Sequence, residues 1–512
     1  MTESRTKNVV RNSTYAIVIQ IVNVIIGLVV RTVFIKTLNQ TYLGIEGVFT
    51  NILTLLSFAE LGVGEAITFK LYKPLAQNNI DEIVSIMHIF KKMYRIIGGF
   101  IIIFGTIFTP FIKYIVDVPN IDENIYIIYI LYVINTGISY LYIYKKTLLI
   151  ADQKSYIANK YTQIIIVLKS ICQIFILLFT KKFLLYLITQ VLFTFISNYY
   201  VSKKIDKLYP YLMKRNINLD IINKEKKEVI ENIKSIVCYK FGSVILDGTD
   251  NIIISILFGV MMVAKSSNYL FIINYFSSLL YLITNAMTAS IGNLNVLANN
   301  KRKEEVLNCM LFIVIWMYGF SSFGMYIFFN DIITIWCGSS YLLETNVVIA
   351  LLISFFITKV HSVCFTYRTT LGLYKEGKYG PILAAVLNLV LSVLFGIQYG
   401  IMGVFIATSV SRIITLGIID PVLIYKKAFR TKVKKYYLKY SEFTIFLMIS
   451  SILPIILNNI LSSKWKLNMV PVIIRIIIFT IIYNLIFLFI SWKSKEFMEV
   501  RNLLMSNYRR KR

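Results

Sequence analysis

Charged side chains occur inside long apolar segments of this 512-residue chain. Glu60 interrupts the apolar run LSFAELGVGEAITFKLYKP, and other polar or small residues recur around it at spacings of three and four: Glu46, Thr50, Thr54, Ser57 and Gly64. This spacing places the six residues on one face of a helix. A carboxylate on such a face can hold a proton or a cation, or accept hydrogen bonds from hydroxyl groups.

Other apolar segments repeat this pattern with acids and with bases. An isolated charge at the centre of a membrane costs about 2.5–3.5 kcal/mol, so each charge must face protein or water. Pairing between helices would satisfy them, but polar faces on so many segments favour a shared hydrated cavity. We expect Arg31 to lie at the depth of Glu46, a possible partner. The further charged residues are Asp247, Asp250, Lys169, Lys359 and Arg412.

The segments that carry these charges are long enough to cross a membrane. The chain is 57% hydrophobic and only 16% charged, with a mean hydropathy of +0.69, whereas soluble domains are about 25% charged. Apolar runs of about 18–25 residues recur throughout. The sequence therefore predicts an all-α polytopic membrane protein with about fourteen spans: 13–36, 43–69, 96–116, 124–144, 161–180, 183–202, 235–258, 266–291, 307–329, 345–367, 379–398, 400–424, 441–461 and 470–492.

The basic residues predict the orientation of these spans. With the N-terminus inside, Lys and Arg fall about six times as often in cytoplasmic segments as in outside loops, as the positive-inside rule requires. The net charge of +28 is then explained by topology and by anionic lipid, and nucleic-acid binding is not expected. We expect both termini to be cytoplasmic and the first helix to remain uncleaved.

The longest cytoplasmic segment suggests a division of the chain into two six-helix lobes. It contains KEKKEVIENIK, which is typical of a charged helix, and it falls between the sixth and seventh spans. The expected organisation is an N-terminal lobe at 1–202, a cytoplasmic linker at 203–234, a C-terminal lobe at 235–424, and two additional helices with a basic tail at 425–512.

Three stretches carry a resemblance to a known family. YLGIEGVFTNILTLLSFAELGVGEAITFKLYKPLA resembles the second span of Wzx-type polysaccharide repeat-unit flippases, within the MATE-like MOP exporter superfamily. LDGTDNIIIS and SNYLFIINYFSSLLYLITNAMTASIGNL resemble the seventh and eighth spans of the Gram-positive capsule or teichoic-type branch. The 6+6+2 plan and the cytoplasmic ends also match this family.

This resemblance implies alternating-access flipping of an undecaprenyl-pyrophosphate-linked oligosaccharide from the inner to the outer leaflet of a bacterial cytoplasmic membrane. It implies that cationic cavity residues hold the pyrophosphate or sugar acids, and that acids carry a coupling proton or sodium ion or contact sugar hydroxyls. The candidate anion contacts are Arg31, Lys169, Lys359 and Arg412. The candidate coupling-ion or sugar contacts are Glu60, Asp247 and Asp250.

Two other readings compete with a flippase. A cation-coupled drug antiporter of the same superfamily should have a more acidic and aromatic cavity. A membrane-embedded polymerase or glycosyltransferase should carry catalytic groups on a large outside loop, whereas the outside loops here are short. The histidines are His88, expected at the surface, and His361, expected to be packed or in a cavity. We expect a monomeric, non-enzymatic protein without a cofactor or metal.

Overall fold

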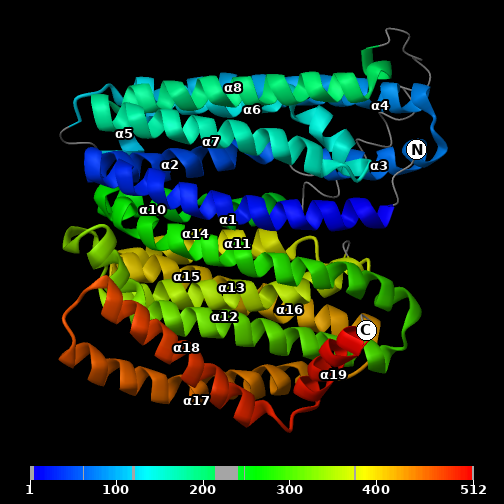
Figure 1. Ribbon diagram of the computed structural model, residues 1–512, viewed down its shortest axis with the longest axis vertical. Coiled ribbons are helices and arrows are strands. Elements are labelled where there is room, and N and C mark those ends of the chain that lie inside the picture. Colours follow the sequence, from blue (N-terminus) through cyan, green and yellow to red (C-terminus); the bar gives the residue numbers. More distant parts are fainter. Residues whose placement is uncertain are drawn as a thin grey trace. The chain divides into compact units, whose positions relative to one another are not determined.

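The computed structural model describes residues 5–60, 63–117, 121–213, 240–246, 248–373 and 376–509, which form helices and no strand. The chain divides into two compact units, Met1–Ala264 and Lys265–Arg512 (Figure 1). Asp247 and most of the expected linker at 203–234 lie outside the described residues.

The first unit is a bundle of long helices. Helix α4 packs on α6, α6 packs on α8, and α7 packs on both α8 and α1. The helices of this unit are α1 (Arg5–Thr37), α2 (Gln40–Leu56), α3 (Val63–Gln77), α4 (Ile80–Ile107), α5 (Ile112–Ile115), α6 (Ile125–Ala151), α7 (Ser155–Thr180), α8 (Phe183–Leu208) and α10 (Asp250–Phe258).

Asparagine side chains fix the start of three of these helices. Asn39 accepts a hydrogen bond from the Thr41 amide at the start of α2, and Asn124 accepts one from the Tyr126 amide at the start of α6. Asn79 caps α4 in the same way. A side-chain acceptor at this position satisfies an amide that has no partner within the helix, so the sequence itself defines these ends.

The second expected span is broken rather than continuous. Helix α2 ends at Leu56, a 3₁₀ turn follows at Ser57–Glu60, and α3 begins at Val63. The prediction of one helix over 43–69 was therefore wrong. Two glycines, Gly62 and Gly64, lie in this stretch, and glycine lowers helix stability by about 1 kcal/mol per residue. Glu60 is the last residue of the 3₁₀ turn and is not part of either flanking α-helix.

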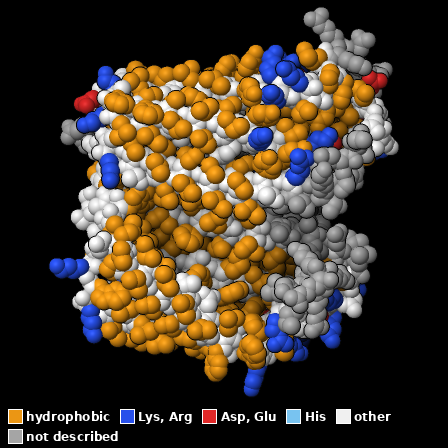
Figure 2. All heavy atoms as spheres, in the orientation of Figure 1, with side chains coloured by type: hydrophobic (Ala, Val, Ile, Leu, Met, Phe, Trp, Pro, Cys, Tyr) orange, Lys and Arg blue, Asp and Glu red, His pale blue; other side chains and the backbone are white. Residues whose placement is uncertain are grey.

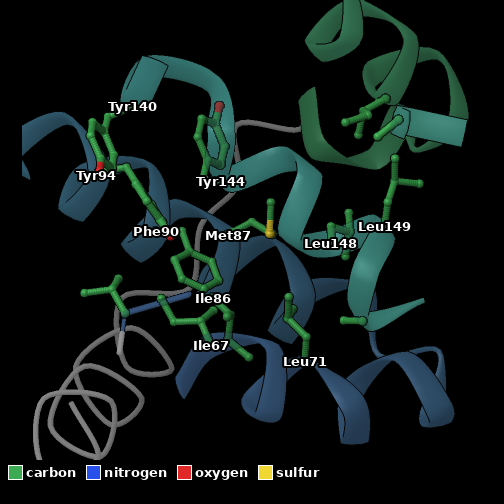
Figure 3. Packing of buried hydrophobic residues seen from close by; sticks show 14 of the residues in the cluster. Ile67, Leu71, Ile86, Met87, Phe90, Tyr94, Tyr140, Tyr144, Leu148 and Leu149 are labelled. Carbon is green, nitrogen blue, oxygen red and sulfur yellow. The ribbon is translucent and has the colours of Figure 1, made fainter. Parts of the chain in front are cut away.

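A hydrophobic core beside this break connects α3, α4 and α6. Figure 3 shows Ile67 and Leu71 of α3 facing Phe90 of α4, with side chains of α6 closing the cluster. The rings of Tyr94 and Tyr140 stack with centroids 6.2 Å apart. These contacts hold α3 against α4 and α6, although α2 is followed by a 3₁₀ turn at Ser57–Glu60.

The second unit contains the remaining long helices. Its strongest packing is between α14 and α15, α13 and α15, α12 and α13, and α17 and α18. Its elements are α11 (Val260–Leu297, which starts in the first unit), α12 (Asn300–Trp336), α13 (Thr345–Thr370), α14 (Gly380–Tyr399), α15 (Ile401–Ile414), α16 (Leu416–Leu423), a π-helix η5 (Ile424–Phe429), α17 (Lys434–Lys464), α18 (Met469–Ser491) and α19 (Lys495–Arg509).

The turn between α14 and α15 is a single residue. Gly400 has a φ of 65°, a left-handed conformation that glycine adopts without steric cost. A Cβ atom on Gly403 would lie 2.0 Å from the carbonyl oxygen of Phe395. The two helices therefore approach more closely than a larger side chain would permit.

The last helix, α19, is attached to the second unit by acidic residues. Glu496 forms an ion pair with Lys439 of α17 at 3.1 Å, and Glu499 pairs with Arg302 of α12. Glu496 is buried. The basic tail predicted after the last span therefore contains a helix that packs on its own unit.

The membrane-protein character of the chain is clear from the described helices. Eleven of them are long and apolar enough to cross a membrane, and a twelfth arises if the bent pair Ile80–Ile107 and Thr109–Ile115 is one span. Of the other two expected spans, 43–69 is the broken segment and 266–291 lies within α11. Hydrophobic side chains cover most of the visible face, while Lys and Arg gather toward the helix ends (Figure 2). The prediction of an all-α polytopic membrane protein is confirmed.

Candidate functional site

The first unit contains a pocket of about 830 Å³ beside the broken second span. Its walls come from α2, the turn at Ser57–Glu60, α3, α4, α6 and the helical residues 240–246. The lining residues are Thr54, Ser57, Glu60, Gly64, Thr68, Phe69, Tyr72, Tyr94, Ile143, Lys146, Thr147, Ile150, Lys240 and Val244. Of the polar face predicted from Glu46 to Gly64, the part from Thr54 to Gly64 lines this pocket, whereas Glu46 and Thr50 are not among its lining residues.

Glu60 is the carboxylate of this pocket. The Tyr94 hydroxyl donates a hydrogen bond to Glu60 Oε1 at 3.4 Å. Tyr94 is only 1% exposed and approaches through space that Gly64 leaves open, since a Cβ atom there would lie 3.1 Å from the Tyr94 hydroxyl oxygen. The bond holds the carboxylate at the pocket wall, where it is accessible to a ligand.

Two lysines that the sequence analysis did not single out lie in the same pocket. Lys146 comes from α6 and donates a hydrogen bond to Asn198 Oδ1 at 3.2 Å, and Lys240 comes from the start of the seventh span. Together with Glu60 they give the lining two cations and one carboxylate. Such a lining can bind an anionic group through charge-assisted hydrogen bonds, and its hydroxyl groups can bind sugar hydroxyls.

Three further charges gather elsewhere in the first unit. Arg31 Nη1 of α1 donates a hydrogen bond to Glu46 Oε2 of α2 at 3.0 Å, so the expected pair is present. Lys169 of α7 interacts electrostatically with Glu46. Tyr132 and Tyr186 interact with both Arg31 and Glu46. Arg31, predicted as an anion contact, therefore pairs with Glu46, and the same carboxylate attracts Lys169.

Asp250 lies at the start of α10, in its first turn. The positive end of the helix dipole stabilises a carboxylate at that position. The next residue, Asn251, donates a hydrogen bond to Asn51 Oδ1 of α2 at 3.4 Å. Asp250 is thus placed where α10 meets α2. Asp247, its predicted companion, lies outside the described residues.

The other two predicted cations, Lys359 and Arg412, belong to the second unit. Lys359 lies on α13 and Arg412 on α15, two helices that pack together. Arg412 is 8% exposed, and Thr408, one turn earlier on its helix, accepts a hydrogen bond from Asn388 of α14 at 3.0 Å. A single cavity shared by all seven predicted residues stays a prediction.

Two groups of paired charges in the second unit were not predicted from the sequence. Asp420 of α16 contacts His361 and Arg368 of α13. Arg475 of α18 pairs with Asp331 of α12 at 2.5 Å, and it also donates a hydrogen bond to Asn458 of α17. The available signal was an acid within or beside an apolar run, as in the stretch TLGIIDPVL.

Metal ligands do not gather in the part of the chain that the structure describes. In residues 5–60, 63–117, 121–213, 240–246, 248–373 and 376–509, no group of three or more His, Cys, Asp or Glu side chains is arranged to hold a metal ion.

No protein-family model matches this chain, and no curated protein matches it.

Solved structures match the chain over most of its length. A lipid II flippase, MurJ, in an inward closed conformation aligns with a TM-score of 0.63 and 16% identity, over 93% of this chain and 98% of that one. An inward-facing multidrug resistance MATE family transporter of the MOP superfamily aligns with a TM-score of 0.59 and 13% identity, over 79% and 96%. A MOP superfamily transporter from Pyrococcus furiosus aligns with a TM-score of 0.52 and 14% identity, over 81% and 94%.

Proposed function

We propose that this membrane protein of the MOP fold is a flippase for a polyprenyl-pyrophosphate-linked oligosaccharide. It would move the headgroup from the inner to the outer leaflet of a bacterial cytoplasmic membrane by alternating access, for assembly of a surface polysaccharide of the capsule, O-antigen-like or teichoic class. The observation that carries this proposal is the pocket of the first unit, with Glu60, Lys146 and Lys240 on its walls.

The pocket suits the headgroup of such a lipid in charge and in size. A pyrophosphate is an anion that lysine side chains bind through charge-assisted hydrogen bonds. Sugars present many hydroxyl groups, which the Thr, Ser and Tyr hydroxyls and the Glu60 carboxylate can bind. A volume of about 830 Å³ lies within the roughly 300–1,000 Å³ of small-molecule sites. The lipid tail can stay in the hydrocarbon while the headgroup crosses.

A cation-coupled drug antiporter is the second candidate function, because MATE transporters share this fold. The aromatic side chains of Phe69 and Tyr72 in the pocket would suit a flat organic cation. However, the two lysines outnumber the single carboxylate there, and like charges in a pocket oppose binding. The charge of the pocket therefore favours an anionic substrate.

The remaining features of the proposal come from the sequence. The excess of Lys and Arg in alternate loops supports cytoplasmic termini. A monomer is proposed because each chain would form its own pathway. A proton or a sodium ion would drive transport, and Glu60 and Asp250 are the described acids that were predicted from the sequence to carry it.

Complementation in a bacterium that lacks its own repeat-unit flippase tests the proposal. The chain should restore surface polysaccharide and deplete the lipid-linked intermediate that accumulates in the inner leaflet. Lys146→Ala and Lys240→Ala should each weaken this rescue, whereas Lys160→Ala, which alters an exposed lysine of α7, should not. Resistance to cationic drugs without any depletion of the intermediate would support the antiporter instead.

A further inference from the structure

A buried group of titratable side chains lies in the second unit, apart from the pocket residues. His361 and Arg368 are two turns apart on α13, and both contact Asp420 of α16. His361 Nε2 lies 2.9 Å from Asp420 Oδ2, and Arg368 Nη1 lies 3.3 Å from Asp420 Oδ1. Arg368 and Asp420 are fully buried, whereas 12% of the His361 side chain is exposed. Of these three side chains, His361 is the one with some exposed surface.

The chemistry of Asp420 defines how His361 can take up a proton. Arginine stays protonated in proteins, and the Arg368 guanidinium lies beside the Asp420 carboxyl. An ionised carboxylate only accepts hydrogen bonds, and neutral His361 must therefore carry its hydrogen on Nε2. The lone pair on Nδ1 is then available. A proton from water binds Nδ1 to give an imidazolium that still donates from Nε2 to Asp420, and the proton returns to water when it leaves.

The segment that carries Asp420 is interrupted at both ends. Helix α15 ends at Ile414, and Thr415 has non-helical dihedral angles of −102° and −83°. Helix α16 is only eight residues long and contains Pro421 directly after Asp420. It continues into the π-helix η5, a rare conformation that is frequent at functional sites. The missing amide of proline also removes a helical hydrogen bond. Asp420 therefore contacts α13 from a short helix whose regular backbone hydrogen bonding is interrupted at both ends.

The other charged and titratable groups on the elements packed against α13 have their own partners or interactions. Lys427 of η5 pairs with Glu376, Glu304 of α12 pairs with Lys435, and Cys309 of α12 donates to Glu499. On α13 itself, Cys364 lies between His361 and Arg368 and interacts with Asp420 and Tyr436. The remaining groups include Lys359 and Tyr367 of α13 itself, Arg412 of α15, Lys426 and Tyr425 of η5, and Tyr318, Tyr326 and Asp331 of α12. The ion-pair partner of His361 is Asp420.

We propose that His361 and Asp420 form a proton-binding site that fastens α16 to α13 when it is occupied. Protonation turns a hydrogen bond between a neutral ring and a carboxylate into an ion pair, which is the stronger contact. When His361 loses the proton, Arg368 remains as the cationic partner of Asp420. The contact between His361 of α13 and Asp420 of α16 is then weaker. A coupling site requires two arrangements whose relative populations change when one proton binds. The short helix α16 would provide these two arrangements. As a coupling site it rests on the proposed transport function.

Hydrogen exchange of residues 416–429 tests the site without a substrate. The full chain in lipid nanodiscs would be compared at about pH 5.5 and about pH 8, on either side of the range in which histidine titrates, after correction for the intrinsic pH dependence of exchange. Wild-type exchange should be roughly fivefold or more slower at the lower pH. His361→Gln can still donate to Asp420 but cannot take up a proton, so its exchange should be similar at both pH values. His88→Gln, on the exposed histidine of α4, should behave as wild type.

A second measurement tests coupling. In the complemented bacterium, a proton/potassium exchanger that collapses the pH gradient should raise the inner-leaflet intermediate for wild type but not raise it further for His361→Gln. Equal wild-type exchange at both pH values overturns the proton site, whether or not the variant folds. A pH-dependent site in a chain that shows no flipping keeps the site and overturns the proposed function. Flipping that ignores the gradient overturns the coupling role.

Discussion

The Arg31 guanidinium on α1 lies 3.0 Å from the Glu46 carboxylate on α2, and both side chains are largely buried, with 13% and 27% of their surfaces exposed. Lys169 of α7 interacts with the same carboxylate. Glu46 therefore attracts Lys169 in addition to its ion-pair partner Arg31. Removing the acid and removing one of the bases should consequently change the stability of the protein by different amounts.

Glu46→Gln should destabilise the protein more than Arg31→Gln. The first change removes the acid that attracts both cations, whereas the second leaves Glu46 with the attraction to Lys169. Breaking a fully buried pair costs about 3–5 kcal/mol, and the partial exposure here reduces the expected loss for Glu46→Gln to about 1–3 kcal/mol. The thermal midpoints of the purified variants measure the order. A larger loss for Arg31→Gln would show that Lys169 does not share the carboxylate.

Lys146→Glu should invert the charge of the pocket in the first unit, from two cations and one acid to one cation and two acids. An anionic headgroup would then be repelled, and we expect flipping to fall at least about tenfold, since charges 4 Å apart interact by about 4 kcal/mol near a protein surface. The inner-leaflet intermediate in complemented cells measures the effect. Lys160→Glu introduces the same charge on an exposed face and is the control. Unchanged flipping by Lys146→Glu would remove this lysine from the pathway.

Asp420→Asn should be among the most destabilising single substitutions in the second unit. It leaves the fully buried Arg368 without its carboxylate, and an uncompensated buried charge of this kind costs about 3–5 kcal/mol. The double variant Asp420→Leu with Arg368→Met removes both charges and should be closer to wild type. Thermal unfolding of the three proteins measures the order. A double variant less stable than Asp420→Asn would contradict the pairing.

Tyr209→Phe should destabilise the end of α8 by about 1–3 kcal/mol, because the Tyr209 hydroxyl donates a 2.5 Å hydrogen bond to the ionised Asp152. Burial and the nearby carboxylate raise the pKa of Tyr209 above its ordinary value. A raised pKa means that this stabilisation is complete below the unfolded value of about 10 and is lost only above it. The difference in thermal midpoint should thus stay constant between about pH 6 and about pH 9. Tyr211→Phe, whose hydroxyl lies near the same carboxylate, is the control for general packing effects.

Several elements of the fold followed directly from the sequence. Apolar runs near 20 residues predict spanning helices, because backbone groups in hydrocarbon must bond within the segment. The pair of Arg31 and Glu46 followed from their similar depth. Thr54, Ser57 and Glu60 were placed on one face by helical periodicity, and they line one pocket even though a 3₁₀ turn interrupts the helix.

Other features depended on contacts that spacing alone does not reveal. Lys145 and Lys146 are adjacent near the end of a span, so the sequence alone does not distinguish their roles. Lys145 pairs with Asp206 at 2.7 Å, while Lys146 lines the pocket. Asp420 stands beside a proline near a predicted span end, where an exposed acid is common. Its burial depends on Arg368, a residue 52 positions earlier on a different helix. Such pairings arise from tertiary packing, which a single sequence does not specify.

The one-residue turn at Gly400 has a mechanical consequence for the second unit. Two helices joined without slack, and in backbone contact at Gly403 and Phe395, cannot slide past each other as separate rods. Helices α14 and α15 should therefore move together as one rigid body. The non-helical Thr415 is the first point after them at which the chain can bend. A tilt of α14 and α15 should therefore change the angle between α15 and α16 at Thr415.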